Sequence, residues 1–211
     1  EYATGFHEDE FTLKQALKTQ AYWLMTAAYT IQIVVSGALN IHMIPFLTDL
    51  GIELAVASGM MSLMVFSSIP SRFFGGVMAD RVGKERLKFL MAAVFFIQAS
   101  GITAFLLDRG AVSIYMMIIG YGICGGAAVP LLMIIIGRYF GRKAFGSIVG
   151  TSNAIRAPFA MIAPVFAGWI YDLSGNYIMA LILFAGASAL AMAIMCVVRP
   201  PVLSIGVTGE D

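Results

Sequence analysis

The chain has few charged residues: Asp, Glu, Lys and Arg make up 12% of its 211 residues, about half the fraction in an average soluble domain. Hydrophobic residues make up 60%, more than a water-soluble fold of this size can hide in its interior. The composition therefore excludes an ordinary soluble domain and predicts an integral membrane protein. The net charge of +1 identifies no partner, because in a membrane the position of each charge matters more than the sum; we expect no nucleic-acid partner.

Cysteine is also scarce. Cys124 and Cys196 are the two cysteines, and both lie inside apolar runs, so we interpret them as small core residues rather than as a disulfide or metal ligands. We expect no metal and no cofactor. The chain begins at Glu1 and has no signal-peptide pattern, and we interpret it as part of a longer protein.

Long apolar runs dominate what remains. Each exceeds the roughly 20 residues that a helix needs to cross about 30 Å of hydrocarbon. Because the runs are continuous rather than short and alternating, they predict helices and not a β-barrel. The six expected spans are Ala21–Phe46, Leu54–Met78, Leu87–Leu107, Ala111–Ile136, Phe145–Tyr171 and Tyr177–Val198. The fold class is therefore an all-α membrane bundle of six helices.

Basic residues fall almost entirely on one side of these spans. Of the 13 Lys and Arg residues, ten lie before the first span, between spans two and three, between spans four and five, or after span six. Arg109 alone lies in the loops of the other side. The positive-inside rule then places both termini and the two basic loops in the cytoplasm, in what we expect to be the plasma (inner) membrane.

The ends of the chain have a different composition. Residues 1–20 are mostly polar, with Glu8, Asp9 and Glu10 grouped, and predict a cytoplasmic linker. Residues 21–199 form the transmembrane bundle. Residues 200–211, with Gly206 and Gly209, predict a disordered cytoplasmic tail.

A charged turn, Gly76–Arg86, joins spans two and three and resembles the signature loop of the major facilitator superfamily. In that family the loop follows the second helix of each half, and the span count and orientation here agree. The resemblance implies a conformational latch that must break as the two halves of a transporter rock, although the same cations could simply anchor the turn at anionic headgroups. We expect two glycines to permit close helix approach and Asp80 to sit at a helix N-terminus beside an Arg. The latch residues are Gly76, Asp80, Arg81, Gly83, Lys84 and Arg86.

A second stretch, Arg138–Gly146, follows a glycine-rich fourth span and resembles the monocarboxylate-transporter-like and oxalate/formate-antiporter branches. The start of span one, residues 13–24, does so too. The resemblance covers nearly the whole chain, but as the C-terminal half of a twelve-helix fold. It implies a secondary transporter whose partners are an N-terminal six-helix half of the same protein, the lipid bilayer and a small organic anion bound between the halves.

Arg72 and Arg156 are the two cations inside the spans, about 9 Å and 16 Å from the cytoplasmic ends at 1.5 Å per residue. Each costs about 2.5–3.5 kcal/mol to insert, even on a lenient scale, and the acidic residues can all be placed in loops or termini. Two unpaired guanidiniums facing one cavity would bind a carboxylate, and the family resemblance implies the same role. The alternatives are snorkelling for Arg72 and pairing with an acid of the other half for Arg156.

Polar side chains accompany these cations. On span one they recur at helical spacing and so share a face that should line a cavity or meet another helix. On spans two and five a serine precedes each Arg by one turn. The same groups could instead serve as glue between helices. The expected site residues are Tyr29, Gln32, Ser36, Asn40, Ser68, Ser152 and Asn153, with Arg72 and Arg156.

Two observations limit this hypothesis. Ser68 stands where many proton-coupled relatives carry an Asp, so proton coupling through this half is in doubt, and His42 is interpreted as an interfacial residue. Export of a drug-like or sugar substrate remains the alternative within transport, and a non-transporting scaffold or sensor the alternative outside it. An intramembrane hydrolase is not expected, because the chain has neither a Gly-x-Ser-x-Gly turn nor a paired acid.

Overall fold

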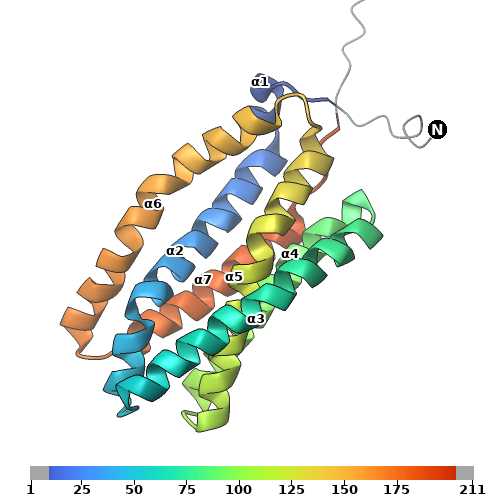
Figure 1. The fold of residues 1–211 in the computed structure, drawn as a ribbon. Coiled ribbons are helices and arrows are strands. Elements are labelled where there is room, and N and C mark those ends of the chain that lie inside the picture. Colours follow the sequence, from blue (N-terminus) through green and yellow to red (C-terminus); the bar gives the residue numbers. More distant parts are fainter. Residues whose placement is uncertain (1–9, 203–211) are drawn as a thin grey trace, which may run out of the picture.

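A computed structural model gives the fold of this chain and describes residues 10–202. Within that range the chain is helical, with no strand. Its elements are α1 (Leu13–Leu17), α2 (Gln20–Asp49), α3 (Leu54–Arg81), the 3-10 turn η1 (Lys84–Arg86), α4 (Leu87–Leu107), α5 (Ala111–Phe140), α6 (Phe145–Ser174) and α7 (Ile178–Val197). Figure 1 shows the six long helices running side by side.

Six helices of the described chain are long and apolar enough to cross a membrane, which confirms the six predicted spans. Several extend beyond the apolar run that predicted them: α2 continues to Asp49, α3 to Arg81 and α5 to Phe140. The extra turns are polar or aromatic, and a helix needs no apolar side chains once it has left the hydrocarbon. Arg72 therefore lies nine residues from the end of α3, about 14 Å, although the added turn lies beyond the apolar run and does not change its depth within that run.

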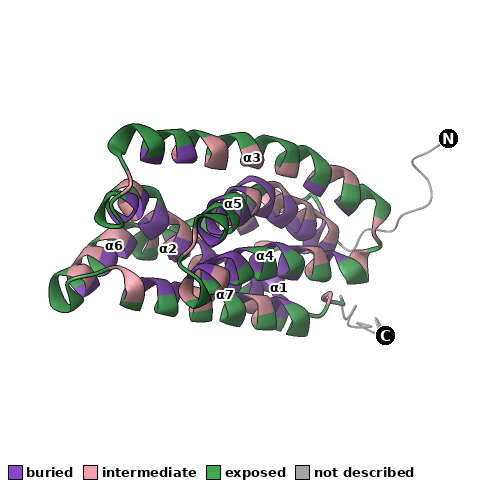
Figure 2. Ribbon diagram, turned by 90° about the horizontal axis from the view of Figure 1, so that it is seen from below, coloured by how far each residue is buried: buried purple, intermediate pink, exposed green. Residues whose placement is uncertain are grey.

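Helix α5 is the centre of the bundle. It packs against α3 on one side and α4 on another, α6 packs mainly on α2, and α7 packs on α4 and α2. In the most apolar stretch of each helix, 61% of residues are buried in α5 but only 22% in α6 and 11% in α3. Figure 2 shows this contrast, with buried positions concentrated on α5 and a long exposed surface on α3. Thus α3 and α6 present the least covered faces of the bundle.

Small residues set how closely α3 approaches α5. A Cβ atom built on Gly126 would overlap the Ser71 hydroxyl and the Ser68 carbonyl oxygen, and one built on Gly122 would overlap Ser67 in the same way. The two glycines are four residues apart, so they share one face of α5. Backbone meets backbone there, as in small-xxx-small packing of membrane helices.

The segment before α2 packs onto the bundle. Thr12 and Gln15 form a capping box that starts α1, and the Phe11 ring is 2% exposed. The Phe11 amide donates to the Phe140 carbonyl oxygen at the end of α5 (3.0 Å), and the two rings meet edge to face with centroids 5.5 Å apart. Residues 10–17 therefore hold the end of α5.

One cysteine interpretation is wrong. Cys124 is buried in α5, as expected, but Cys196 is exposed near the end of α7, because it lies on the face of α7 away from α4 and α2. Of the expected acidic group of the linker, Glu8 and Asp9 lie outside the described residues, as does most of the expected tail, 203–211, whereas Glu10 accepts a hydrogen bond from the Lys143 backbone amide (2.9 Å).

Candidate functional site

Arg156 is buried where α6 crosses α2, with 2% of its surface exposed. Its Nε donates to the Ser152 carbonyl oxygen one turn earlier (3.1 Å), and its Nη2 donates to the Asn153 side-chain oxygen. Its Nη1 is buried and has no hydrogen-bond partner. No carboxylate in the described part of the chain forms an ion pair with this guanidinium. One nitrogen of this buried cation thus lacks a hydrogen-bond partner within the described chain.

Tyr29 of α2 covers one face of this guanidinium. The Arg156 Cζ lies 4.5 Å from the centroid of the Tyr29 ring, a cation–π geometry that can contribute about 2 kcal/mol when the pair is desolvated. The tyrosine is itself 8% exposed, so water does not screen the contact. Tyr29 and the hydrogen bonds from α6 fix the plane of the guanidinium, and its buried Nη1 is left without a hydrogen-bond partner.

A hydroxyl pair braces the same helix crossing one turn away. Ser152 Oγ and Thr26 Oγ lie 3.2 Å apart and are buried. Tyr22, Thr26 and Ser152 line a cavity of about 10 Å³ beside this pair. The sequence prediction included Ser152 but missed Thr26, although Thr26 lies three residues before Tyr29 and therefore on the same helical face.

Arg72 has a different environment. Its side chain is exposed on α3, and no hydrogen bond or ion pair joins it to Arg156 or to another described residue. Figure 1 shows α3 and α6 on opposite flanks of the bundle, and neither helix packs mainly on the other. The bundle by itself therefore does not bring the two arginines together.

The remaining site residues divide between these environments. Asn153 binds Arg156, whereas Asn40 is exposed on α2. Ser68 turns back on its own helix, with its hydroxyl donating to the Val65 carbonyl oxygen (2.7 Å). Ser36 offers its carbonyl oxygen to the Tyr121 hydroxyl of α5 (2.9 Å). The predicted stripe on α2 thus meets other helices over most of its length.

Gln32 points into the bundle and not toward Arg156. Its amide nitrogen donates to the Gln98 side-chain oxygen of α4 (2.7 Å) and to the Ser36 hydroxyl (2.9 Å). Both glutamines are almost fully buried, and each retains one atom without a partner, Gln32 Oε1 and Gln98 Nε2. Gln98 was not among the predicted residues, since a single glutamine in an apolar run gives no sign of its partner.

The charged turn after α3 is held by α5. Arg138 Nη1 donates to the Val82 carbonyl oxygen (2.8 Å), and its Nη2 pairs with Asp80 at 3.4 Å. Two expectations about this turn are wrong. Asp80 lies in the last turn of α3, not at a helix N-terminus. Neither Gly76 nor Gly83 makes a close approach within the bundle, because a Cβ atom at either would meet nothing within 4 Å.

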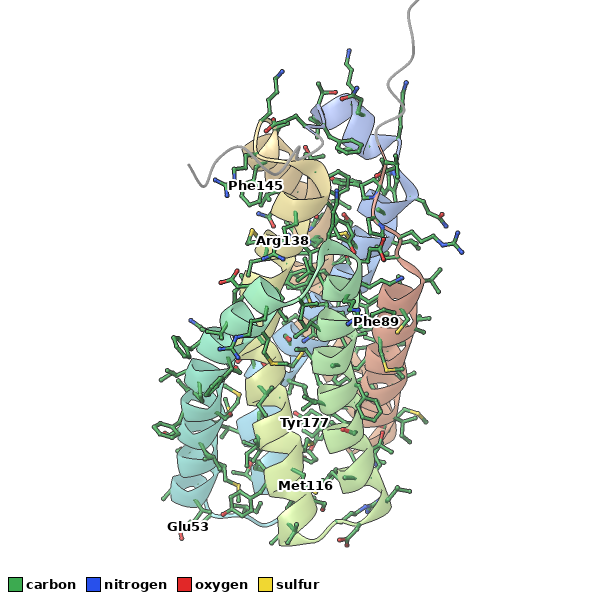
Figure 3. The ribbon with its side chains drawn as sticks, turned by 90° about the vertical axis from the view of Figure 1, so that its right-hand side faces the viewer. Glu53, Phe89, Met116, Arg138, Phe145 and Tyr177 are labelled. Carbon is green, nitrogen blue, oxygen red and sulfur yellow. The ribbon has the colours of Figure 1, made fainter. Side chains whose placement is uncertain are left out.

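The other latch residues are more open to solvent. Arg81 and Arg86 are exposed, and Lys84 is partly buried in η1. Figure 3 shows nitrogen-tipped side chains gathered at the end of the bundle that carries Arg138 and Phe145, opposite the end with Glu53. The uneven distribution of basic residues in the sequence therefore corresponds to one end of the folded bundle.

His42 joins three helices at the opposite end. Its Nε2 lies 3.0 Å from the Pro164 carbonyl oxygen of α6, and its Nδ1 lies 3.1 Å from the Tyr177 hydroxyl at the start of α7. A carbonyl oxygen only accepts, so Nε2 carries the hydrogen and Nδ1 accepts from Tyr177. His42 is therefore a bridge between helices and not an isolated interfacial side chain.

Comparison with known proteins identifies relatives of this chain. A model of the Major Facilitator Superfamily matches residues 3–158. The chain is 33% identical over 142 residues to the uncharacterized transporter YycB of Bacillus subtilis (strain 168), covering 65% of this chain and 34% of that protein. It is 23% identical over 151 residues to monocarboxylate transporter 13 of Rattus norvegicus (72% and 35%). It is 30% identical over 97 residues to the multidrug transporter protein MdtP of Bacillus subtilis (strain 168) (46% and 17%). In each case the chain spans about a third or less of the relative's length.

Proposed function

The chain belongs to the Major Facilitator Superfamily, and from this premise we propose that it forms the C-terminal half of a secondary transporter that carries a small organic anion, a mono- or dicarboxylate, by alternating access. The observation that supports this function is the buried Arg156 guanidinium with its unpartnered Nη1. A buried cation that lacks a counter-ion is costly in a membrane. An anion that binds and leaves would supply the missing charge in part of the transport cycle.

The surroundings of Arg156 favour a small carboxylate. Nε and Nη2 are already engaged by Ser152 and Asn153, and the Tyr29 ring occupies one face. A carboxylate would therefore approach the Nη1 edge, where a charge-assisted hydrogen bond is about twice as strong as a neutral one. We infer that Arg156 binds the anion and that Tyr29 and Asn153 orient the guanidinium.

Arg72 would complete the site from a second helix. Its exposed position on a flank of the bundle suits contact with an N-terminal six-helix half, whose closure would cover α3 and α6. In that arrangement Arg72 would meet either the anion or an acid of the other half. Snorkelling along α3 toward the nearer membrane surface is the competing role.

The runner-up function is export of a drug-like or sugar substrate. Similarity to MdtP supports it, because that match involves the same family. Two cations within the spans argue against a cationic drug, since like charges repel. A non-transporting scaffold or sensor on the same fold would not need the free Nη1 of Arg156.

Topology follows from the same proposal. The basic end, with Arg138 and the turn at Asp80, would face the cytoplasm, and both termini would lie there, in the plasma membrane. The exposed Asp80–Arg138 pair, at 3.4 Å, contributes at most about 1 kcal/mol. It is weak enough to break and reform as the two halves rock.

Uptake into proteoliposomes by the full-length protein tests the proposal. The panel comprises labelled formate, lactate, pyruvate, oxalate and a neutral sugar, each with wild type, Arg156→Gln and Arg72→Gln. Arg199→Gln is the matched control, because Arg199 is an exposed arginine after α7. Saturable carboxylate uptake that is lost in Arg156→Gln and kept in the control supports the anion site.

Other outcomes separate the alternatives. Carboxylate uptake unchanged by Arg156→Gln would refute the site. Uptake lost only in Arg72→Gln would move the anion to α3. Sugar uptake without carboxylate uptake would favour the runner-up, and no transport by a folded protein would favour the scaffold.

A further inference from the structure

A cleft lies at the end of the bundle opposite the basic turns. Its volume is about 500 Å³, within the range of roughly 300–1,000 Å³ typical of small-molecule sites. It forms where the end of α2, the α4–α5 connection, the end of α6 and the start of α7 meet. It is separate from Arg156, which none of its lining residues contacts.

Opposite charges line this cleft without neutralising each other. Asp49 enters from the last turn of α2 and Arg109 from the α4–α5 connection. No ion pair joins them in the described structure, and the Asp49 carboxylate accepts a hydrogen bond from the Tyr171 hydroxyl. A ligand that carries both a cation and an anion could therefore engage each of them.

Two tyrosines form a rigid wall beside these charges. The Tyr171 and Tyr177 rings lie with centroids 4.4 Å apart at an interplanar angle of 33°. Tyr177 is further fixed by its hydrogen bond to His42. Burial first, and then the nearby Asp49 carboxylate, raises the pKa of the Tyr177 hydroxyl. The wall is thus neutral, aromatic and under the influence of a negative charge.

The net charge of this end decides which ligand suits it. The described helix ends and connections there carry Asp49, Glu53, Asp108 and Asp172 against the single Arg109. A purely anionic ligand would be repelled, whereas an ammonium group would be attracted to Asp49 and to the electron-rich faces of the tyrosines. The end of a membrane bundle is also where tyrosines meet lipid headgroups.

We propose that this cleft binds the headgroup of a zwitterionic phospholipid, with its phosphate on Arg109 and its primary ammonium on Asp49 beside the Tyr171–Tyr177 wall. Phosphatidylethanolamine has this chemistry. Phosphatidylglycerol has the phosphate but lacks the ammonium. Phosphatidylcholine has a methylated cation that cannot donate a hydrogen bond to Asp49. The bound lipid would tie the connection before α5 to the ends of α2, α6 and α7.

Lipid retention on the full-length protein tests this site. The protein is placed in phosphatidylcholine nanodiscs that contain equal amounts of phosphatidylethanolamine and phosphatidylglycerol, and the lipids retained after release are counted by native mass spectrometry. We expect a preference for phosphatidylethanolamine over phosphatidylglycerol of about three- to fivefold, the size of an exposed ion pair. Asp49→Asn should abolish the preference, and Arg109→Gln should lower retention of both lipids.

Glu53→Gln is the matched control, since Glu53 is an exposed carboxylate at the same end but does not line the cleft. It should leave the preference unchanged. Equal retention of both lipids by wild type, or loss of the preference in Glu53→Gln, would overturn the proposal. Soluble phosphoethanolamine that binds as well as the lipid in phosphatidylcholine nanodiscs would overturn the assignment to a lipid.

Discussion

Replacing Gly126 with alanine tests the contact between α3 and α5 at one of its tightest points. A Cβ atom there would overlap both the Ser71 hydroxyl and the Ser68 carbonyl oxygen. The hydroxyl can rotate away, but the carbonyl oxygen belongs to the backbone, so α3 itself must shift. Overpacking of this kind costs about 1–3 kcal/mol.

Gly125 gives a control on the same turn of α5. A Cβ atom at Gly125 would meet nothing within 4 Å. Both substitutions gain the same helix propensity, about 1 kcal/mol. The difference between Gly126→Ala and Gly125→Ala therefore isolates the steric overlap, and we expect Gly126→Ala to be less stable by about 1–3 kcal/mol.

Equilibrium unfolding of the two variants in mild detergent measures this difference, with helix content followed by circular dichroism. Gly122→Ala should resemble Gly126→Ala, because a Cβ atom there would overlap Ser67 in the same way. If Gly126→Ala were as stable as Gly125→Ala, the close packing of α3 on α5 would be refuted.

Three further predictions concern the polar contacts. Tyr29→Leu should weaken carboxylate binding by up to about 2 kcal/mol while Tyr29→Phe retains it, because the cation–π contact needs only a ring. Titration of substrate binding to the two variants measures this difference. Equal losses of affinity in both variants would contradict the role of the ring. A double-mutant cycle of Gln32→Met and Gln98→Met should give a coupling of about 0.6–1.7 kcal/mol in unfolding free energy, whereas zero coupling would mean that the two amides do not pair. His42→Leu removes two hydrogen bonds and should cost about 1–3 kcal/mol. The measurement is faster hydrogen exchange around Pro164 in α6 and at the start of α7, and unchanged exchange would argue against the bridge.

Hydropathy alone predicted the six spans, because each apolar run has to cross the same thickness of hydrocarbon. It gave the helix ends less well, since α3 continues to the exposed Arg81 and α5 to Phe140, which is buried against Phe11. The position of Asp80 was misjudged for that reason. Polar periodicity along α2 predicted one shared face, but Tyr29 covers Arg156 of α6, Gln32 binds Gln98 of α4 and Asn40 is exposed.

The sequence could not predict which residues far apart along the chain contact each other. Helical spacing grouped Tyr29 with the polar face of α2 and Ser152 with Arg156, but it could not show that Tyr29 covers Arg156 or that Gln32 binds Gln98. These contacts depend on which helices pack together and on how far along the bundle axis each residue lies. Thr26 was within reach of the same periodicity and was missed because a single hydroxyl in an apolar run is common.

The most direct measurement for the central claim is the dissociation constant of the transported carboxylate for the full-length protein and its Arg156→Gln variant. A charge-assisted hydrogen bond to Nη1 contributes about 1.5–3 kcal/mol, so we predict binding weaker by about 10- to 100-fold, with Arg199→Gln unchanged. A dissociation constant for Arg156→Gln within about twofold of the wild-type value, well below that loss, would show that the buried guanidinium does not bind the anion.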